Sequence, residues 1–228
     1  MDVITGAVAR GLAALNEYDA KRFLSEFGIP VPREKLAATA DEAAAAAAAT
    51  GFPVVLKASG TTLLHKTEVG GVSLNLKTEQ EVRDESGRLL RIPGCEAVLV
   101  QEMVQGDREL VCGLTRDPLL GACVMFGLGG IFTETLDDAV FRVAPITTGD
   151  ALEMLRQIRS ARVLESFRGQ SAVDIGALAR ILIAVGEIGL RYKAIRAIDL
   201  NPIKIRPNGS PVAVDALISL LPQAAGRD

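Results

Sequence analysis

The sequence predicts an α+β fold in which neighbouring strands pair antiparallel. Apolar runs flank two turn signals, Arg-Asp-Pro at 116–118 and Asn-Gly at 208–209, and this arrangement is typical of β-hairpins. Helical patterns separate other strand-like runs, so strands and helices occur in mixed order. Since hairpins require antiparallel pairing, these observations favour α+β over a doubly wound parallel fold. We find no internal repeat and no long linker.

Two helices are expected near the start of the chain. The stretch "EYDAKRFLSEFGIPVP" is amphipathic, and Gly28 ends the helix while Pro30 prevents its resumption. Thr39 and Glu42 form a capping-box pattern ahead of an alanine run, and Gly51 ends this second helix. Short alanine side chains allow the second helix to lie close to a sheet, so we assign it a structural role.

The remaining elements follow from periodicity and turn signals. The run "PVVLKA" is continuous and apolar up to its lysine, whereas "GVSLNLK" alternates like a half-buried strand. We expect strands at 53–58, 71–77, 97–104 and 140–146, helices within 78–91, 149–159 and 174–191, and a final hairpin that turns at 208–209.

Composition excludes several classes of protein. Hydrophobic residues make up 49% of the 228 residues and aromatic residues 4%, so a sizeable core must be built from Ala, Val, Leu and Ile. The net charge of −3 argues against a general nucleic-acid binder. No uncharged apolar run approaches the ~20 residues of a membrane span, and the N-terminus lacks the pattern of a signal peptide. The three cysteines have no CxxC or zinc spacing, so we expect reduced thiols in a cytoplasmic protein.

One group of oxygen-bearing side chains points to a hard cation. Asp199 and Asn201 are two positions apart on one strand and therefore share a face. With the turn near 208–209, Asp215 on the returning strand falls close to opposite Asn201. Such a set suits Mg²⁺, whose other ligands are usually water and phosphate. The alternative is that "DLNP" merely ends a strand and that Asp215 caps the next segment.

Three further features could serve phosphate chemistry. Lys57 ends an apolar strand, where a lysine either meets an anion in a cleft or extends to solvent. The stretch "FGLGGIF" at 126–132 could bring backbone N–H groups to a phosphate, although it fails the GxGxxG spacing and a plain turn is the alternative. His65 is the only histidine, and its imidazole could carry a phosphoryl group beside Lys66 and a double glycine. A loop histidine without a role is the competing interpretation.

Taken together, these residues resemble a known family. From about Tyr18 to Leu217 the chain is similar to the nucleotide-binding β subunit, or C-terminal domain, of ADP-forming acyl-CoA synthetases, which are grouped with succinyl-CoA synthetase among the ATP-grasp proteins. The motifs that carry the resemblance occur in one order: "GFPVVLKA", "LLHKTEVGGV", "VLVQEMV", "GLTRDPLLG", "MFGLGGIFTE", "FRVAPI", "DLNPIKI" and "VAVDA". The segment "EVRDESGRLLRIPGCEA" is shorter than the helix and loop that the family usually has there.

The resemblance implies an ATP-grasp fold over residues 1–228, with two α+β lobes at about 18–97 and 98–222 that hold ATP between them. It also implies a role for each matching residue. The expected contacts are Lys57 and the loop containing His65 and Lys66 for the phosphates, the backbone of Gln101, Glu102, Met103 and Val104 for adenine, Glu109 for the ribose, Asn201 and Asp215 with nearby Asp199 for Mg²⁺, and Arg142 for a phosphate.

The resemblance further implies the reaction acyl-CoA + ADP + phosphate ⇌ acid + CoA + ATP. A partner subunit forms an acyl phosphate, and a histidine there carries the phosphoryl group towards the nucleotide, with His65 as a second carrier. Because the sequence has no CoA-binding region, we expect a separate β subunit that needs a CoA-binding α partner. The family's usual assembly is α2β2. The β subunit would meet acyl-CoA or acyl phosphate through this partner. The alternatives are a nucleotide-sensing module without turnover and the ATP-grasp part of a fused protein acetyltransferase.

Overall fold

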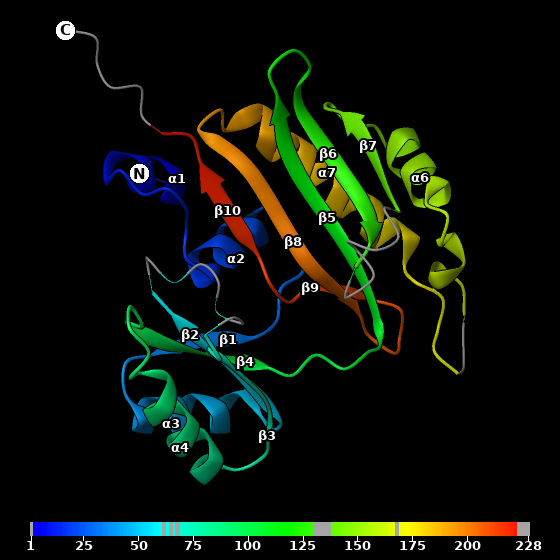
Figure 1. Cartoon of the computed structure of the whole chain (residues 1–228). Helices are drawn as coiled ribbons and strands as arrows, with labels where there is room; N and C mark the ends of the chain where they lie inside the picture. Colours follow the sequence, from blue (N-terminus) through cyan, green and yellow to red (C-terminus); the bar gives the residue numbers. More distant parts are fainter. Residues whose placement is uncertain are drawn as a thin grey trace, which may run out of the picture. The chain divides into compact units, whose positions relative to one another are not determined.

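The computed structural model describes residues 2–60, 63, 66, 69–129, 138–166 and 169–222 (Figure 1). The chain folds into two compact units. The small unit comprises Asn16–Tyr18 and Pro32–Val104, and the large unit comprises Met1–Leu15, Asp19–Val31 and Gln105–Asp228. Among the described residues, no helix is both long and apolar enough to cross a membrane.

The small unit is a four-stranded antiparallel sheet with two helices. The strand order is β1-β4-β2-β3, and α3 and α4 lie together against the sheet (Figure 1). Buried alanines of α3 pack against apolar side chains of β2 and β4, which confirms that the alanine run is a core helix. The elements are β1 (Glu34–Ala37), α3 (Ala40–Thr50), β2 (Val54–Ser59), β3 (Val72–Leu76), α4 (Glu79–Leu89) and β4 (Ala97–Glu102).

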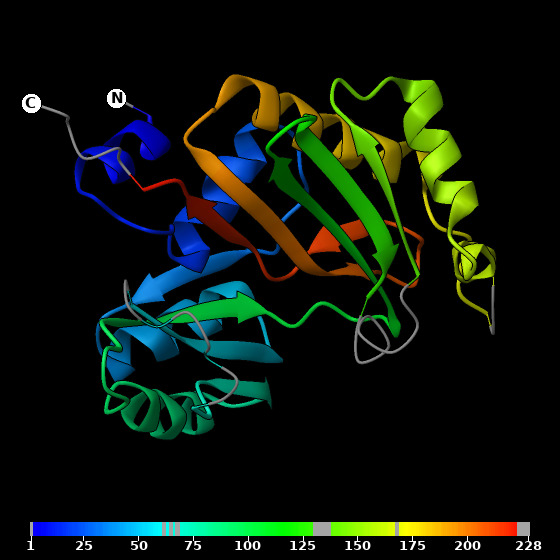
Figure 2. The ribbon, with the colours of Figure 1, turned by 45° about the horizontal axis from the view of Figure 1, so that its top comes forward.

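The large unit is built around a six-stranded antiparallel sheet. Its main order is β10-β8-β5-β6-β7, and β9 also pairs with β8. In both views α7 lies on one side of β5, β6 and β8 (Figures 1 and 2). The elements are α1 (Val3–Ala9), α2 (Glu17–Glu26, whose first two residues belong to the small unit), β5 (Arg108–Asp117), β6 (Gly121–Leu128), β7 (Ala139–Val143), α6 (Thr148–Gln157), the 3₁₀ helix η2 (Ala161–Leu164), α7 (Ile175–Arg191), β8 (Ile195–Ile205), β9 (Pro211–Ala213) and β10 (Leu217–Leu220).

The large sheet has two chemically different faces. Leu110, Cys112 and Leu114 of β5 belong to the hydrophobic core that includes α2, α6 and α7. Because side chains alternate along a strand, Glu109 and Gly113 lie on the other side, which we call the outer face. Gly113 pairs with Asp199 of β8, so Asp199 also lies on the outer face. The core therefore occupies one side of the sheet, and the other side carries the acidic side chains of Glu109 and Asp199.

The expected elements are confirmed, with shifts of a few residues at their ends. Both turns are present: Asp117 accepts hydrogen bonds from the two backbone amides of the first hairpin turn, and Gly209 adopts a φ of +88° in the second. The units divide between Val104 and Gln105 rather than at the expected boundary 97/98. The reason is that β4, which begins at Ala97, pairs with β1 and β2 of the small unit.

Candidate functional site

Lys57 projects from the central strand of the small sheet. All six residues of β2 are buried, and Lys57 is only 6% exposed. Its Nζ donates to Oε1 of Glu17 at 2.6 Å. Lys66 donates to the other oxygen, Oε2, of the same carboxylate. Two lysines that the sequence connects with phosphate therefore share one buried counterion, which sequence analysis did not single out.

Glycines and an arginine fix the two ends of the segment that contains Lys66. A Cβ on Gly60 would lie 1.9 Å from the carbonyl oxygen of Gly94, so no other residue fits there. At the other end, Gly71 donates to the carbonyl of Lys66 at 2.7 Å. Arg88 of α4 donates to the carbonyl of Gly70 at 2.9 Å. The backbone on both sides of the segment is thus tied to the small unit.

His65 itself lies outside the described residues, and so do most of its neighbours in the segment. The same is true of residues 130–137, which contain the end of the glycine-rich stretch 126–132. The roles expected for these residues therefore remain predictions from the sequence.

The expected adenine-binding hinge, residues 101–104, is the end of β4 and the two residues that follow it. Gln101 is buried inside the sheet. The backbone N–H of Glu102 donates to the carbonyl of Arg33 at 2.9 Å, and that of Met103 donates to the carbonyl of Pro53 at 3.3 Å. Glu102 also accepts from the guanidinium of Arg33 at 2.9 Å. The chain leaves the small unit here in a fixed conformation.

The oxygen-bearing side chains of the large unit share one β-ladder. β9 pairs Ala213 with Ile203, and β10 pairs Leu217 with Asp199, in the same register along β8. Counting along that register places Asp215 opposite Asn201, as the sequence predicted. The N–H of Val214 donates to the carbonyl of Pro202 at 3.1 Å, which continues the ladder between the two strands. Asp199, Asn201 and Asp215 therefore occupy adjacent positions.

The charges in this group disfavour each other. Although Asp199 is exposed in part, the surrounding protein removes water from its carboxyl group, and this desolvation together with the negative charge of Asp215 raises the pKa of Asp199. Behind it, complete burial and the charge of Asp199 raise the pKa of the Cys112 thiol. A cation at this position would relieve the repulsion between the two carboxylates.

The donor set fits Mg²⁺ better than a transition metal. Within the described parts of the chain, no group of three or more His, Cys, Asp or Glu side chains is arranged to hold a metal ion. Two carboxylates and one amide give a few oxygen ligands, and Mg²⁺ is typically held by one or two carboxylates plus water and substrate phosphates. The group is therefore suited to a metal that arrives with a nucleotide.

Glu109 lies on the outer face of the same sheet. It pairs with Lys204 in the β5–β8 ladder, and the Lys204 ammonium lies 3.6 Å from a Glu109 carboxylate oxygen. The Glu109 side chain is about one-third exposed, so a hydroxyl group could reach it. This position is consistent with the ribose contact that the resemblance implies.

Arg142 does not join the group on the outer face. It pairs with Val124, a core residue, so its side chain leaves β7 on the side of α6. There it donates to Gln157 of α6 at 2.7 Å and lies 3.6 Å from Glu153. The structure thus separates Arg142 from Asp199 by the thickness of the sheet and gives it partners within the large unit.

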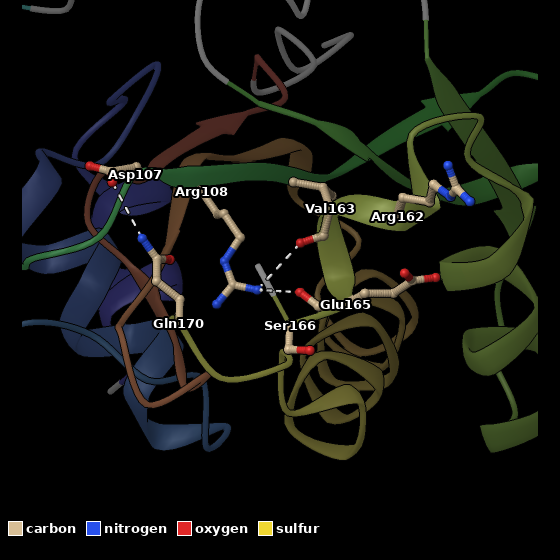
Figure 3. Close-up of a pocket in the computed structure, with 7 residues that line it drawn as sticks. All are labelled: Asp107, Arg108, Arg162, Val163, Glu165, Ser166 and Gln170. Carbon is tan, nitrogen blue, oxygen red and sulfur yellow. Dashed lines mark hydrogen bonds between the residues drawn. The ribbon is translucent and has the colours of Figure 1, made fainter. Parts of the chain in front are cut away.

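A pocket of about 710 Å³ lies elsewhere in the large unit (Figure 3). Arg108, 7% exposed, fills its centre and donates to the carbonyls of Val163, Glu165 and Ser171. The Arg108 side chain thus holds the backbone carbonyls of three residues in and after η2. None of the residues that line this pocket is among the expected site residues.

Comparisons with known proteins agree on one family. A profile of the ATP-grasp domain matches residues 6–220. The β subunit of ADP-forming acetate–CoA ligase I from Pyrococcus furiosus is 42% identical over 213 residues, which cover 90% of this chain and 91% of that subunit. ADP-forming acetate–CoA ligase I from Archaeoglobus fulgidus is 40% identical over 196 residues, which cover 83% of this chain but 28% of that longer protein.

Solved structures of one archaeal enzyme show the same fold. Dinucleotide-forming acetyl-coenzyme A synthetase 1 from Ca. Korarchaeum cryptofilum, in complex with coenzyme A and Ca-AMPCP, superposes with a TM-score of 0.91 at 41% identity over 96% of this chain and 99% of that one. A second form of that enzyme holds coenzyme A and Mg-AMPPCP, with a phosphohistidine segment that points towards the nucleotide-binding site.

Proposed function

The chain belongs to the ATP-grasp family and, within it, to the β subunits of ADP-forming acetate–CoA ligases, and from this premise we propose how its residues work. It is the nucleotide-binding subunit of an enzyme that interconverts acyl-CoA, ADP and phosphate with carboxylic acid, CoA and ATP. The proposal concerns the ligands of the nucleotide, the phosphoryl carrier and the partner.

The register of the β8–β10 ladder is the observation that carries the proposal. It places Asn201 opposite Asp215 and beside Asp199, on the outer face of the large sheet. We propose that Asn201 and Asp215 hold Mg²⁺, with Asp199 close by. When bound, Mg²⁺ would neutralise negative charge on the phosphate oxygens during phosphoryl transfer.

The small unit would contribute two further contacts to the nucleotide. Lys57 and Lys66 would bind phosphate oxygens as point charges. Both ammonium groups contact the carboxylate of Glu17, so they lie close enough to act on the same nucleotide. At the hinge, the amides of Glu102 and Met103 have backbone partners. The Val104 amide donates to no acceptor among the residues that the structure describes and is the amide we assign to the adenine edge. Glu109 would accept a hydrogen bond from a ribose hydroxyl.

His65 would carry the phosphoryl group. In the direction of ATP synthesis, an imidazole nitrogen forms a bond to phosphorus as the carrier on the partner subunit gives up its phosphoryl group. A β-phosphate oxygen of ADP then attacks the phosphorus, the nitrogen–phosphorus bond breaks, and His65 returns to neutral imidazole. Positioning and charge neutralisation supply most of the catalysis in such transfers, and Lys57 and Lys66 would provide them.

The acyl chemistry would require a CoA-binding α partner, which we expect to assemble as α2β2. Relatives support the need for a partner, though not its stoichiometry, in two forms: the Pyrococcus furiosus protein is a β subunit, and the longer Archaeoglobus fulgidus protein contains the matching region within one chain. Acetyl-CoA is the first substrate to test because the relatives are named for acetate.

The decisive experiment joins the chain to a CoA-binding α subunit and measures ATP formed from acetyl-CoA, ADP and phosphate. We expect ATP only when both chains and Mg²⁺ are present. Nucleotide binding without ATP formation in a verified complex would favour a sensing module. Acetyl transfer to a protein without net ATP formation would favour the fused-acetyltransferase alternative.

A further inference from the structure

Glu17 is a buried carboxylate that no motif of the sequence explains. It is the first residue of α2, and with Asn16 and Tyr18 it belongs to the small unit, as do both of its lysine partners. Glu17 is 7% exposed, and its side chain alone is 4% exposed. A carboxylate rarely occupies such a position unless its charge is paired.

Both oxygens of Glu17 are used, each by a different lysine. Oε1 accepts from Lys57 at 2.6 Å and Oε2 accepts from Lys66. The two lysine side chains are 8% and 14% exposed. Because the two oxygens belong to one carboxylate, the two ammonium groups lie close to each other.

Two ammonium groups this close repel each other strongly where water is scarce. Lysine responds to such surroundings by losing its proton, and a neutral amine no longer attracts phosphate. One carboxylate that contacts both lysines offsets part of this repulsion. Glu17 can therefore hold both ammonium groups in place at once.

Two ion pairs on α4 of the small unit differ from this cluster. Glu79 and Glu85 pair with arginines on α4, and their side chains are 51% and 33% exposed. Exposed pairs of this kind contribute little to stability. Glu17 differs because it is buried and because both of its partners are expected phosphate ligands.

We propose that Glu17 is a positioning residue that holds Lys57 and Lys66 side by side as a preformed pair of phosphate ligands. The inference rests on the proposed function, since it takes the two lysines as contacts of the nucleotide phosphates. Glu17 itself touches the lysines and acts through them.

The test compares two ligands that differ only in phosphate. The affinity of the full chain for Mg-ADP and for adenosine is measured by calorimetry or ligand-detected NMR, in wild type and in Glu17→Gln. Gln keeps the size of the side chain but removes the charge, so Mg-ADP should bind about tenfold more weakly or worse. Adenosine should bind as it does to wild type, because it does not use the lysines.

Two controls keep the outcome unambiguous. Glu79→Gln removes the charge of an exposed ion pair in the same unit and should leave both affinities unchanged. Glu17→Asp keeps the charge on a shorter side chain, so it should recover part of the affinity for Mg-ADP. This rescue would not be expected if Glu17 only filled space.

Each result separates the inference from the proposed function. If wild type binds no Mg-ADP, the proposed function fails. If wild type binds Mg-ADP and Glu17→Gln binds it equally well, Glu17 does not position the lysines. If Glu17→Gln loses ADP and adenosine equally while Glu79→Gln loses neither, Glu17 supports the fold of the unit rather than the phosphate ligands, and the inference is overturned.

Discussion

The two units contain charge clusters of opposite design. In the small unit, a single carboxylate, Glu17, lies between two lysines, and opposite charges hold each other in place. In the large unit, Asp199 and Asp215 are like charges in adjacent positions, and their repulsion contributes to the raised pKa of Asp199. The first cluster pairs opposite charges within the chain, whereas the second brings like charges together, and a cation would relieve their repulsion.

This difference indicates that the two units would contribute to nucleotide binding in different ways. Lys57 and Lys66 are preorganised before any ligand arrives, because burial and Glu17 fix them. In the large unit, strand register holds Asp199 and Asp215 close together although their charges repel. A bound Mg²⁺ would remove this repulsion. We therefore expect the small unit to act as a rigid cation pair and the large unit to act as a metal-dependent element.

The largest effect should come from a residue that belongs to neither charge cluster. We proposed that both clusters serve phosphate binding, so the covalent step is left to His65. His65→Asn, assayed with the α partner, should lower transfer from acyl phosphate to ADP by more than about 10³-fold, because the amide has no nucleophilic ring nitrogen. Binding of Mg-ADP should stay within a few fold of wild type.

Radiolabelled ATP provides the direct readout for this variant. Wild-type complex quenched in alkali should carry acid-labile, alkali-stable label on this subunit, and His65→Asn should carry none. Because the chain has a single histidine, the assignment of the label is unambiguous. Turnover at the wild-type rate in His65→Asn would mean that the partner's carrier reaches the nucleotide unaided.

The second-largest effect is expected from a change in the group of Asp199, Asn201 and Asp215. Asp215→Ala removes a charged ligand while the ladder on both sides of it keeps its hydrogen bonds. Activity should fall about 10²-fold at limiting Mg²⁺ and recover in part as Mg²⁺ is raised. Initial rates over a Mg²⁺ series measure this dependence. A variant with wild-type rates at limiting Mg²⁺ would remove Asp215 from the metal site.

The two charge clusters should also differ in how loss of a carboxylate changes the free energy of unfolding. Glu17→Gln leaves two buried lysines without their shared carboxylate and should lower the free energy of unfolding by about 3 kcal/mol. Asp199→Asn removes a repulsive charge and should raise it by less than about 1 kcal/mol, since the side chain is partly exposed. Urea unfolding without metal at neutral pH gives both values.

The pH dependence of the Asp199 variant has a definite direction. A raised pKa in the folded state means that Asp199 favours folding only below its ordinary pKa, and that this contribution is lost as pH rises through the folded-state pKa. The advantage of Asp199→Asn over wild type should therefore be largest near neutral pH and vanish in acid. Two variants that change stability in the same direction would refute the contrast between the clusters.

The smallest effect is expected at Arg142. Its partners are Gln157 and Glu153 of α6, and its side chain is on the core side of β7. Arg142→Ala should change the affinity for Mg-ADP by less than about twofold and the unfolding free energy by about 1 kcal/mol or less. A large loss of affinity measured by calorimetry would instead support the phosphate contact that the resemblance implies.

Features governed by local rules could be predicted from the sequence. The Asn-Gly turn and the alternation in "DLNPIKI" were enough to place Asp215 opposite Asn201, because the register of a hairpin follows from its turn. The alanine helix and its Thr39 cap were readable for the same reason: the cap and the residues it serves are three positions apart.

Features that depend on distant contacts could not be predicted in this way. Glu17 lies 40 positions from Lys57 and 49 from Lys66, and nothing in "EYDAKRF" distinguishes it from an exposed acid at the start of a helix. Arg142 is an intermediate case. Alternation along the strand puts it on the same face as Val140, a residue packed against the core, so the signal was present but the resemblance pointed elsewhere.

The single register of the β8–β10 ladder also limits which changes of length the family can tolerate. Asn201 and Asp215 are 14 positions apart, and the turn around Asn208 lies between them. Substitutions in that turn leave the spacing intact, whereas loss or gain of one residue would shift the pairing and send Asp215 towards the core face. The hairpin can therefore vary in composition far more freely than in length, and a relative with an odd insertion there should have abandoned this ligand pair or moved it.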